Sequence, residues 1–228
     1  MRSTLKRRSS VSFWLAAGCV WIGISLVLPA ARADILNPSF ETPNIGSTDT
    51  RYPGTSTTIT GWNTVDVTLL GTLWAADAGN QSLLLSNIKN STVSGIAYQN
   101  AATDTDYTYN LRLAMSADWS GALGQDRTIL VYWGGTGGTG GTLVGTFNIA
   151  SKPSGWSETN MQWQQFSIYD LPVTASLTEL RFENLYSHQY GPTLDDVYLA
   201  VAPEPGTLAL LALGLPALAW WRKRKRDK

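Results

Sequence analysis

Cysteine and histidine each occur once in the 228 residues of the chain. Cys19 lies in an apolar stretch near the N-terminus, so residues 34–202 can form no disulfide, cysteine nucleophile or cysteine-ligated metal site. His188 is the one histidine, and neither an H-E-x-x-H nor a G-x-S-x-G motif occurs. The sequence therefore predicts a protein that is not an enzyme. A glycoside-active enzyme, which needs only two carboxylates at a set distance, is the least favoured alternative.

Basic residues are scarce between the two ends of the chain. The range 34–205 has six Lys and Arg against sixteen Asp and Glu, a net charge of −10, whereas the whole chain is neutral. Such a surface repels nucleic acid, because binding to phosphates needs Lys and Arg. We therefore expect no nucleic-acid partner, and a surface that suits neutral ligands and cations better.

The remaining basic residues gather at the two termini, and the N-terminal group begins an export signal. MRSTLKRR (1–8) is basic, 11–29 is a long apolar run, and ARA (31–33) has the small-x-small form of a cleavage site. We predict a signal peptide over residues 1–33 that signal peptidase removes. An uncleaved anchor helix is the alternative, because the apolar run is long.

The C-terminus has three consecutive parts. Pro203-Glu204-Pro205 is followed by an almost entirely apolar run, 207–221, and then by the basic cluster 222–228. At ~1.5 Å per residue a helix over the apolar run is roughly 22 Å long, shorter than the ~30 Å hydrocarbon core of a bilayer. The basic cluster should stay on the cytoplasmic side. We predict a short transmembrane helix, with a buried core helix as the alternative.

These three parts, residues 203–228, resemble the PEP-CTERM sorting signal of Gram-negative bacteria, with Pro203, Glu204 and Pro205 as the sorting motif. The resemblance implies that an exosortase, a membrane transpeptidase, recognises the chain and cleaves it near the motif. It also implies a host that makes exopolysaccharide. The expected route is export across the inner membrane, transient anchoring through the terminal segments alone, and a final location at the cell surface or outside the cell.

In residues 34–202, apolar and polar residues alternate with a period of two. In DYTYNLRLAMS (106–116) the tyrosines, leucines and methionine fall on one face, which is typical of a half-buried strand. Glycine, asparagine, aspartate and proline separate such segments, and no amphipathic helix is evident. The predicted fold class is all-β, an antiparallel β-sandwich or jelly roll, flanked by an N-terminal signal helix and the C-terminal transmembrane helix. The expected strands lie in 81–88, 93–100, 106–116, 127–133, 142–149, 163–169, 177–185 and 194–201.

Several motifs of this middle region resemble the choice-of-anchor C family. They are, in order, ILNPSFETP (35–43), ITGW (59–62), GIAYQN (95–100) and GPTLDDVYL (191–199). The resemblance implies a galactose-binding-like jelly roll over residues 34–202. It also implies that ILNPSFETP is the opening strand and lies beside the last strand.

In jelly rolls of this kind, carboxylates on the two terminal strands commonly hold a structural calcium ion, which takes about six to eight oxygen ligands. The matching candidate ligands are Glu41 and Asp196 with Asn37, and Asp195 is a further candidate. Asp195 and Asp196 should point to opposite faces of a strand, so at most one of them faces a given site. Ordinary surface or turn roles for these residues are the alternative.

Aromatic side chains are the candidate ligand contacts, because rings pack against the C–H faces of sugars while polar neighbours bind the hydroxyl groups. Trp119 and Trp156 lie in the turn-like segments SADWSG and PSGWSE, where we expect them to be exposed and to contact glycan. Trp62 and Trp163 lie in strand-like segments and are expected in the core. Core packing is the alternative for Trp119 and Trp156 as well.

The segment GGTGGTGG (134–141) contains a formal G-x-G-x-x-G pattern. A dinucleotide site needs a helix to begin there, but a strand-like segment follows. We therefore expect a flexible hairpin loop.

Together these features predict an exported, exosortase-sorted protein of the cell surface or extracellular space, with a non-catalytic module that binds glycan or exopolysaccharide. The first alternative is a structural matrix or adhesion protein that binds other proteins or itself. Exposed tryptophans favour the glycan-binding module, whereas a long apolar edge strand favours self-association.

Overall fold

The computed structural model describes residues 34–86, 93–117, 127–149, 155–187 and 190–202. The predicted signal helix, transmembrane helix and sorting segment lie outside these residues. The domain boundary at residue 34 and the end of the domain at residue 202 stay predictions. None of the described residues forms a helix with the length and hydrophobicity of a membrane span.

The described part of the chain is all-β, as predicted, and contains ten strands. They are β1 (Thr50–Ser56), β2 (Asn63–Leu70), β3 (Ser82–Leu84), β4 (Ile96–Ala102), β5 (Tyr109–Ala117), β6 (Arg127–Trp133), β7 (Thr142–Ile149), β8 (Gln164–Leu171), β9 (Leu177–Asn184) and β10 (Pro192–Val201).

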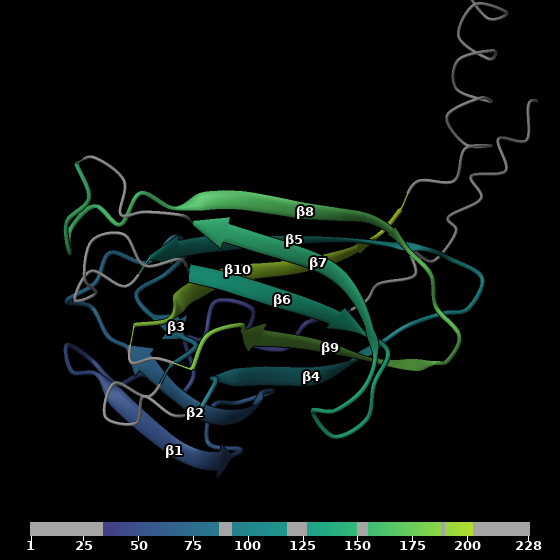
Figure 1. The fold of residues 1–228 in the computed structure, drawn as a ribbon, viewed down its shortest axis with the longest axis horizontal. Helices are drawn as coiled ribbons and strands as arrows, with labels where there is room; N and C mark the ends of the chain where they lie inside the picture. Colours follow the sequence, from purple (N-terminus) through teal and green to yellow (C-terminus); the bar gives the residue numbers. More distant parts are fainter. Residues whose placement is uncertain (1–33, 87–92, 118–126, 150–154, 188–189, 203–228) are drawn as a thin grey trace, which may run out of the picture.

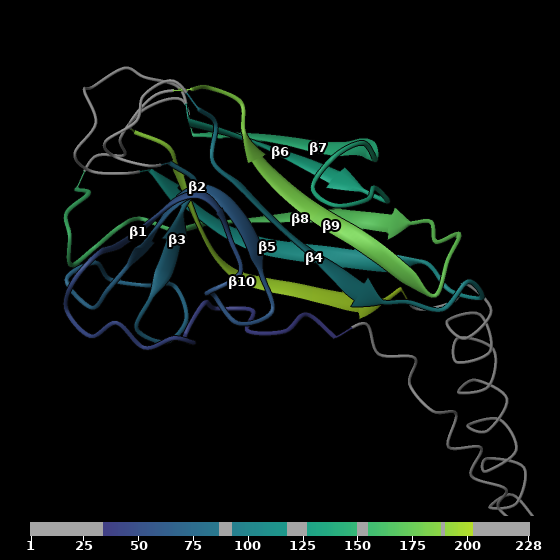
Figure 2. The ribbon, with the colours of Figure 1, turned by 90° about the horizontal axis from the view of Figure 1, so that it is seen from below.

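The strands form two layers of a sandwich (Figures 1 and 2). The hydrogen-bonded order is β7-β6-β9-β4-β2-β3-β10-β5-β8, with β1 paired to β2, and each pairing is antiparallel. We call β7, β6, β9, β4, β2 and β1 the larger layer and β3, β10, β5 and β8 the smaller layer. The strand β2 joins them, because Asn63–Val65 pair with β4 and Thr68–Leu70 pair with β3. The two ends of this order approach each other, because the rings of Phe147 on β7 and Phe166 on β8 have centroids 4.7 Å apart.

The space between the layers is filled by the side chains that the period of two predicts. On β5, Leu111, Leu113 and Met115 are buried in the core, whereas Arg112 on the other face is exposed. On β6, Ile129 and Val131 point to the same core. Burying such side chains contributes roughly 1.5–3 kcal/mol each, so this one core accounts for much of the driving force for folding.

The structure contains strands in all eight predicted segments and adds two that were not predicted, β1 and β2. The strand β1 contains Pro53 and Gly54 and has an irregular register between Tyr52 and Thr55. Proline cannot donate to a sheet ladder and is confined to edges and bulges, so β1 fits only as the outermost strand. The strand β2 does alternate, with Val67 and Leu69 in the core.

The segment ILNPSFETP is not a strand, which corrects the prediction of an opening strand. Asn37 and Phe40 have positive φ angles of 51° and 58°, and the backbone turns there. Its carbonyl groups accept hydrogen bonds that do not belong to a strand ladder. The indole N–H of Trp62 donates to Asn37 O at 3.0 Å, and Val197 N–H donates to Pro38 O at 3.0 Å. The segment therefore lies beside β10, as expected, but as an irregular cover over the end of the core.

Candidate functional site

Of the two tryptophans predicted to contact glycan, the structure describes only Trp156. Trp119 lies outside the described residues. Trp156 was expected to be exposed but is only 7% exposed, and it packs in a second apolar cluster with Trp74, Leu84 and Met161. The rings of Trp74 and Trp156 have centroids 6.3 Å apart. A turn-like sequence did not imply exposure, because this turn folds back onto the outer side of the smaller layer.

Two of the three predicted calcium ligands bind the backbone around them. The amide of Asn37 donates to Thr42 O at 2.8 Å and to Thr60 O at 3.1 Å. The Glu41 Oε1 atom accepts hydrogen bonds from Asn80 N–H at 2.7 Å and Gln81 N–H at 2.8 Å. In the described part of the chain, no three acidic, histidine or cysteine side chains gather into a set that could hold a metal ion. Calcium binding by Asn37, Glu41 and Asp196 therefore stays a prediction.

The third predicted ligand, Asp196, sits at an irregularity of β10. Asp195 pairs with Ala114 and Tyr198 with Arg112, so β10 carries one residue more than β5 over this stretch. Asp196 has a φ angle of 43°, as the extra residue of a β-bulge often does. Because of this bulge, Asp195 and Asp196 both lie on the outer side of the smaller layer, and the prediction of opposite faces was wrong.

Asp195 is completely buried. Its Oδ2 accepts hydrogen bonds from Asp77 N–H at 2.8 Å and Ala78 N–H at 3.0 Å, and its Oδ1 accepts one from Asp196 N–H at 2.7 Å. Burial raises the pKa of Asp195 to about 8, although these backbone hydrogen bonds act in the opposite direction. This side chain fixes the loop after β2 onto the sheet.

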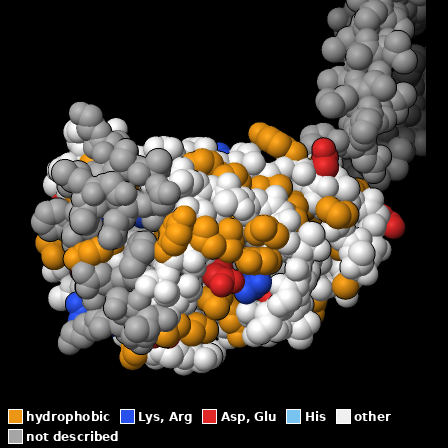
Figure 3. Space-filling model, in the orientation of Figure 1, with side chains coloured by type: hydrophobic (Ala, Val, Ile, Leu, Met, Phe, Trp, Pro, Cys, Tyr) orange, Lys and Arg blue, Asp and Glu red, His pale blue; other side chains and the backbone are white. Residues whose placement is uncertain are grey.

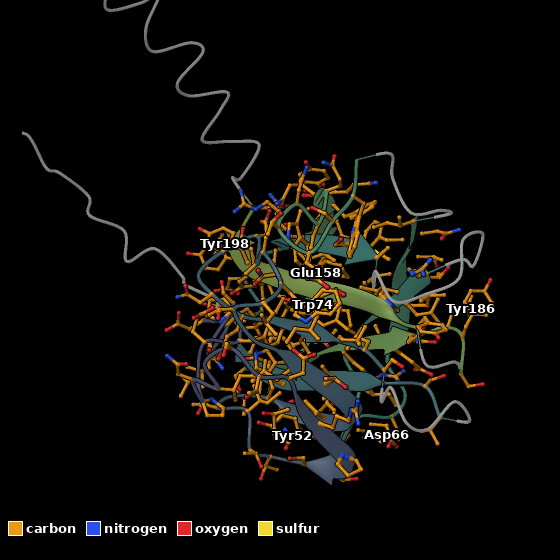
Figure 4. All side chains as sticks on the ribbon, turned by 90° about the vertical axis from the view of Figure 1, so that its left-hand side faces the viewer. Tyr52, Asp66, Trp74, Glu158, Tyr186 and Tyr198 are labelled. Atoms are coloured by element: carbon orange, nitrogen blue, oxygen red, sulfur yellow. The ribbon has the colours of Figure 1, made fainter. Side chains whose placement is uncertain are left out.

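Asp196 forms an exposed cluster with Arg112 and Tyr198. The Arg112 guanidinium donates to Asp196 Oδ2 at 2.9 Å, and its central carbon lies 5.7 Å from the centroid of the Tyr198 ring. Tyr198 is 56% exposed. Figure 4 shows it on the flank of the sandwich opposite to Tyr186. We call Arg112, Asp196 and Tyr198 the arginine–tyrosine platform.

Neighbouring strands extend the platform. Arg112 pairs with Ser167 of β8, and Asn110 is the next outward residue of β5. Tyr169 on β8 is among the most exposed apolar side chains. The surface thus offers an open ring, a cation held by a carboxylate, and short hydroxyl and amide groups, which is the combination that binds the ring faces and hydroxyl groups of a sugar.

The glycine-rich segment 134–141 forms a hairpin, as predicted, and folds onto the outer face of the larger layer. Thr136 and Thr139 exchange backbone hydrogen bonds of 3.0 and 3.3 Å. A β-carbon at Gly138 would lie 2.7 Å from Cε1 of Tyr98, so only glycine fits over this ring. Gly140 O accepts a hydrogen bond from the Arg181 guanidinium at 3.0 Å. We call residues 134–141 the glycine hairpin.

Arg181 supports the glycine hairpin from below. Its guanidinium lies 3.8 Å from the centroid of the Tyr132 ring, which is close cation–π stacking, and donates to Glu183 at 2.7 Å. Figure 3 shows this face of the molecule, where apolar side chains gather around neighbouring acidic and basic side chains. The hairpin is therefore held by side chains of β4, β6 and β9 together.

A hollow of about 440 Å³ opens between the glycine hairpin and the connection from β8 to β9. Its lining consists of glycine backbone, threonine side chains, Ala175, Leu177 and Glu179. Glu179 is only 3% exposed, and its Oε2 accepts a hydrogen bond from Gly138 N–H at 3.0 Å. Neither the hollow nor the platform was predicted from the sequence. The outward positions of Tyr198 and Glu179 follow from alternation only after the strand register is known.

The sequence resembles known proteins at its C-terminal end, where residues 201–225 match the model of the PEP-CTERM protein-sorting motif. This match confirms the predicted motif. No curated protein matches the chain.

Solved structures with similar architecture include carbohydrate-binding modules. The module TmCBM61 in complex with β-1,4-galactotriose is 15% identical, covers 75% of this chain and 100% of its own, and has a TM-score of 0.44. The CBM22-1 xylan-binding domain of Xyn10C from Paenibacillus barcinonensis is 16% identical, covers 77% and 99%, and has a TM-score of 0.46. The K1 cleaved adhesin domain of Lys-gingipain from Porphyromonas gingivalis is 16% identical, covers 69% and 99%, and has a TM-score of 0.42.

Proposed function

We propose that the chain is exported by a Gram-negative cell, processed by an exosortase, and binds polysaccharide through its β-sandwich without catalysis. The observation that carries the binding function is the arginine–tyrosine platform, where Tyr198 is exposed beside an ion pair of Arg112 and Asp196. An exposed ring next to fixed donors and acceptors matches the amphipathic surface of a sugar.

The match to the sorting motif at residues 201–225 supports the export step. The composition agrees with it, because residues 34–205 contain no cysteine and have a net charge of −10. A matrix polysaccharide is a ligand that such a surface meets outside the cell, and a neutral one is not repelled by it.

The edges of the sandwich give less support to the alternative of self-association. The exposed residues of β8 are Gln164, Gln165, Ser167 and Asp170 beside Tyr169, and those of β7 are Thr142, Thr146 and Asn148 beside Leu143. Edges that are mostly polar oppose edge-to-edge pairing. The buried carboxylates Glu179 and Asp195 lie on the outer sides of different layers, so these two do not form the carboxylate pair that a glycoside-active enzyme needs.

Polysaccharide binding is tested by co-sedimentation of the purified protein with exopolysaccharide from the host. Truncating Tyr198→Ala removes the exposed ring, and we expect the affinity to fall about tenfold, which corresponds to about 1.4 kcal/mol of lost contact. Tyr186→Ala, a partly exposed tyrosine on the opposite flank, is the matched control and should bind like the wild type. Equal binding by the Tyr198→Ala and wild-type proteins would exclude the platform as the binding surface.

Processing is tested by measuring the intact mass of the protein from cells with and without their exosortase. We expect a C-terminus truncated near Pro203-Glu204-Pro205 only when the exosortase is present. A C-terminus that is unchanged between the two strains contradicts the sorting proposal.

A further inference from the structure

The hollow under the glycine hairpin has the size and chemistry of a ligand site. Its volume of about 440 Å³ lies within the roughly 300–1,000 Å³ that is typical of small-ligand pockets. Four threonines line it, and so do the backbone groups of four glycines, with Leu177 as its large apolar side chain. No lysine or arginine is among the described lining residues.

Glu179 is the one charged residue in this lining. It is almost completely buried, yet the structure places a donor on only one of its two oxygen atoms, the bond from Gly138 N–H to Oε2. Within the described residues, no hydrogen-bond donor lies on Oε1. Oε1 is not a fully buried atom without a partner, so it keeps access to the hollow and can accept a hydrogen bond from a ligand there.

The surroundings of Glu179 are fixed before any ligand arrives. The Gly134 N–H donates to Glu179 O at 2.9 Å, and a β-carbon at Gly135 would lie 2.9 Å from Glu179 Oε1. Substituting that glycine would therefore crowd the oxygen atom that lacks a donor. Together with the stacking of Gly138 over Tyr98, these contacts hold the glycine hairpin open as one wall of the hollow. Such preorganisation reduces the entropy lost on binding.

The chemistry of the lining selects the class of ligand. A carboxylate oxygen accepts hydrogen bonds, threonine hydroxyl groups both donate and accept them, and Leu177 offers an apolar contact. A sugar ring presents hydroxyl donors and an apolar C–H face in the same small volume. A sugar acid is disfavoured, because its carboxylate would face Glu179 with no cation in the lining.

We propose that this hollow binds one neutral sugar residue, an end or a branch of a polysaccharide chain, with Glu179 Oε1 accepting hydrogen bonds from its hydroxyl groups. The inference rests on the proposed polysaccharide-binding function but uses a different surface from the arginine–tyrosine platform. The hollow belongs to the larger layer and the platform to the smaller one, so the two sites can be separated by mutation.

The test is saturation-transfer NMR of the purified protein with glucose, galactose and mannose, and with glucuronate and galacturonate as the matched anionic sugars. We expect at least one neutral sugar to bind, and its uronate to bind at least about tenfold more weakly. Glu179→Gln replaces a carboxylate oxygen that only accepts hydrogen bonds by an amide that can donate. The affinity for the neutral sugar should therefore fall about tenfold, and the ratio between the affinities for the neutral sugar and its uronate should decrease. Failure of all three neutral sugars to bind, or unchanged binding by Glu179→Gln, overturns the proposal.

A second pair of variants separates occupancy from folding. Ala175→Trp fills the hollow from an exposed lining position, whereas Ser176→Trp adds the same side chain to the exposed neighbour outside the lining. We expect only Ala175→Trp to abolish sugar binding, with similar melting temperatures for both. Equal binding by the two variants contradicts the proposed site.

The platform variant makes the two proposals distinguishable. Tyr198→Ala should leave binding of the free sugar unchanged. If exopolysaccharide binds and depends on Tyr198 but no free sugar binds, the hollow proposal alone fails. If a free sugar binds and depends on Glu179 but exopolysaccharide does not bind at all, the polysaccharide function alone fails.

Discussion

Asp195 and Glu179, the two most deeply buried carboxylates of the described residues, differ in how completely their oxygen atoms are hydrogen-bonded. Asp195, on β10 of the smaller layer, accepts three backbone hydrogen bonds that occupy both oxygen atoms. Glu179, on β9 of the larger layer, accepts one on Oε2, and the described residues supply none to Oε1. Both side chains attach a loop to a sheet, but only Glu179 keeps an oxygen atom facing a hollow.

This difference shows how a buried acid can be assigned to structure or to ligand binding. A carboxylate that is completely buried, and whose two oxygen atoms both accept hydrogen bonds from its own chain, is out of a ligand's reach. One that is held by a single backbone amide, in a preformed hollow, is stabilised further when a ligand donates to it. We therefore regard Asp195 as a structural lock and Glu179 as a ligand-binding group.

The largest loss of stability is expected from removing the carboxylate of Asp195. Asp195→Ala leaves the N–H groups of Asp77, Ala78 and Asp196 without their acceptor, and each buried group left unsatisfied costs about 1–3 kcal/mol. Because relief of the buried acid offsets part of this, we expect the free energy of unfolding in urea to fall by about 2–4 kcal/mol. Asp196→Ala, which breaks only an exposed ion pair, should cost less than about 1 kcal/mol. Equal losses in the two variants would remove the structural role assigned to Asp195.

A second effect is the contribution of Asp195 to the dependence of stability on pH. Burial raises the pKa of Asp195 to about 8, whereas an aspartate in an unfolded chain has a pKa of about 3.9. Between these values the folded state holds a proton that the unfolded state lacks, so the free energy of unfolding falls as the pH rises, by at most about 1.4 kcal/mol per pH unit.

Thermal melting between about pH 5 and about pH 8 measures this dependence. We expect the melting temperature of the wild type to decrease across the range and that of Asp195→Asn to decrease less, because asparagine does not titrate. Identical slopes for the two proteins would show that Asp195 is already ionised at the lower pH. Asp77, whose charge also raises the pKa of Asp195, is the neighbouring acid to vary as a control.

The smallest effect on stability is expected at Glu179. Glu179→Ala removes one acceptor, from Gly138 N–H, and should lower the free energy of unfolding by about 1 kcal/mol. The hairpin should loosen locally, so that the Gly138 amide exchanges with solvent faster than in the wild type. A loss as large as that of Asp195→Ala would mean that Glu179 is also mainly structural, and the contrast between the two acids would disappear.

Much of the fold could be predicted because alternation is a local property. The segments 127–133 and 142–149 match β6 and β7 residue for residue. The strand β1 was not predicted, because Pro53 and Gly54 oppose a strand everywhere except at a sheet edge, and edges are set by the pairing of distant segments. The turns of ILNPSFETP were missed for a similar reason, since Asn37 depends on partners as far along the chain as Thr60.

The candidate sites were harder to predict, because they depend on register and on loop folding. A bulge of one residue at Asp196 changes which of the following side chains face outward, and without it strict alternation would have placed Tyr198 with Leu194 in the core. The glycine hairpin has no side chains that could indicate its contact with Tyr98 or Glu179. Trp156 was expected at the surface because its neighbours are polar, but its ring is covered by Trp74 from a different loop.

The position of β10 has a mechanical consequence. Its ten residues are flanked by β3 and β5, and it ends at Val201, where the match to the sorting motif begins. Tyr198 of the platform lies on the same strand, three residues before its end. In a sandwich tethered at this end, tension from a polysaccharide held at Tyr198 would reach the tether along a single strand. The load would then pass through the covalent backbone of the three residues after Tyr198, and the hydrogen bonds that hold the rest of the sandwich together would carry little of it.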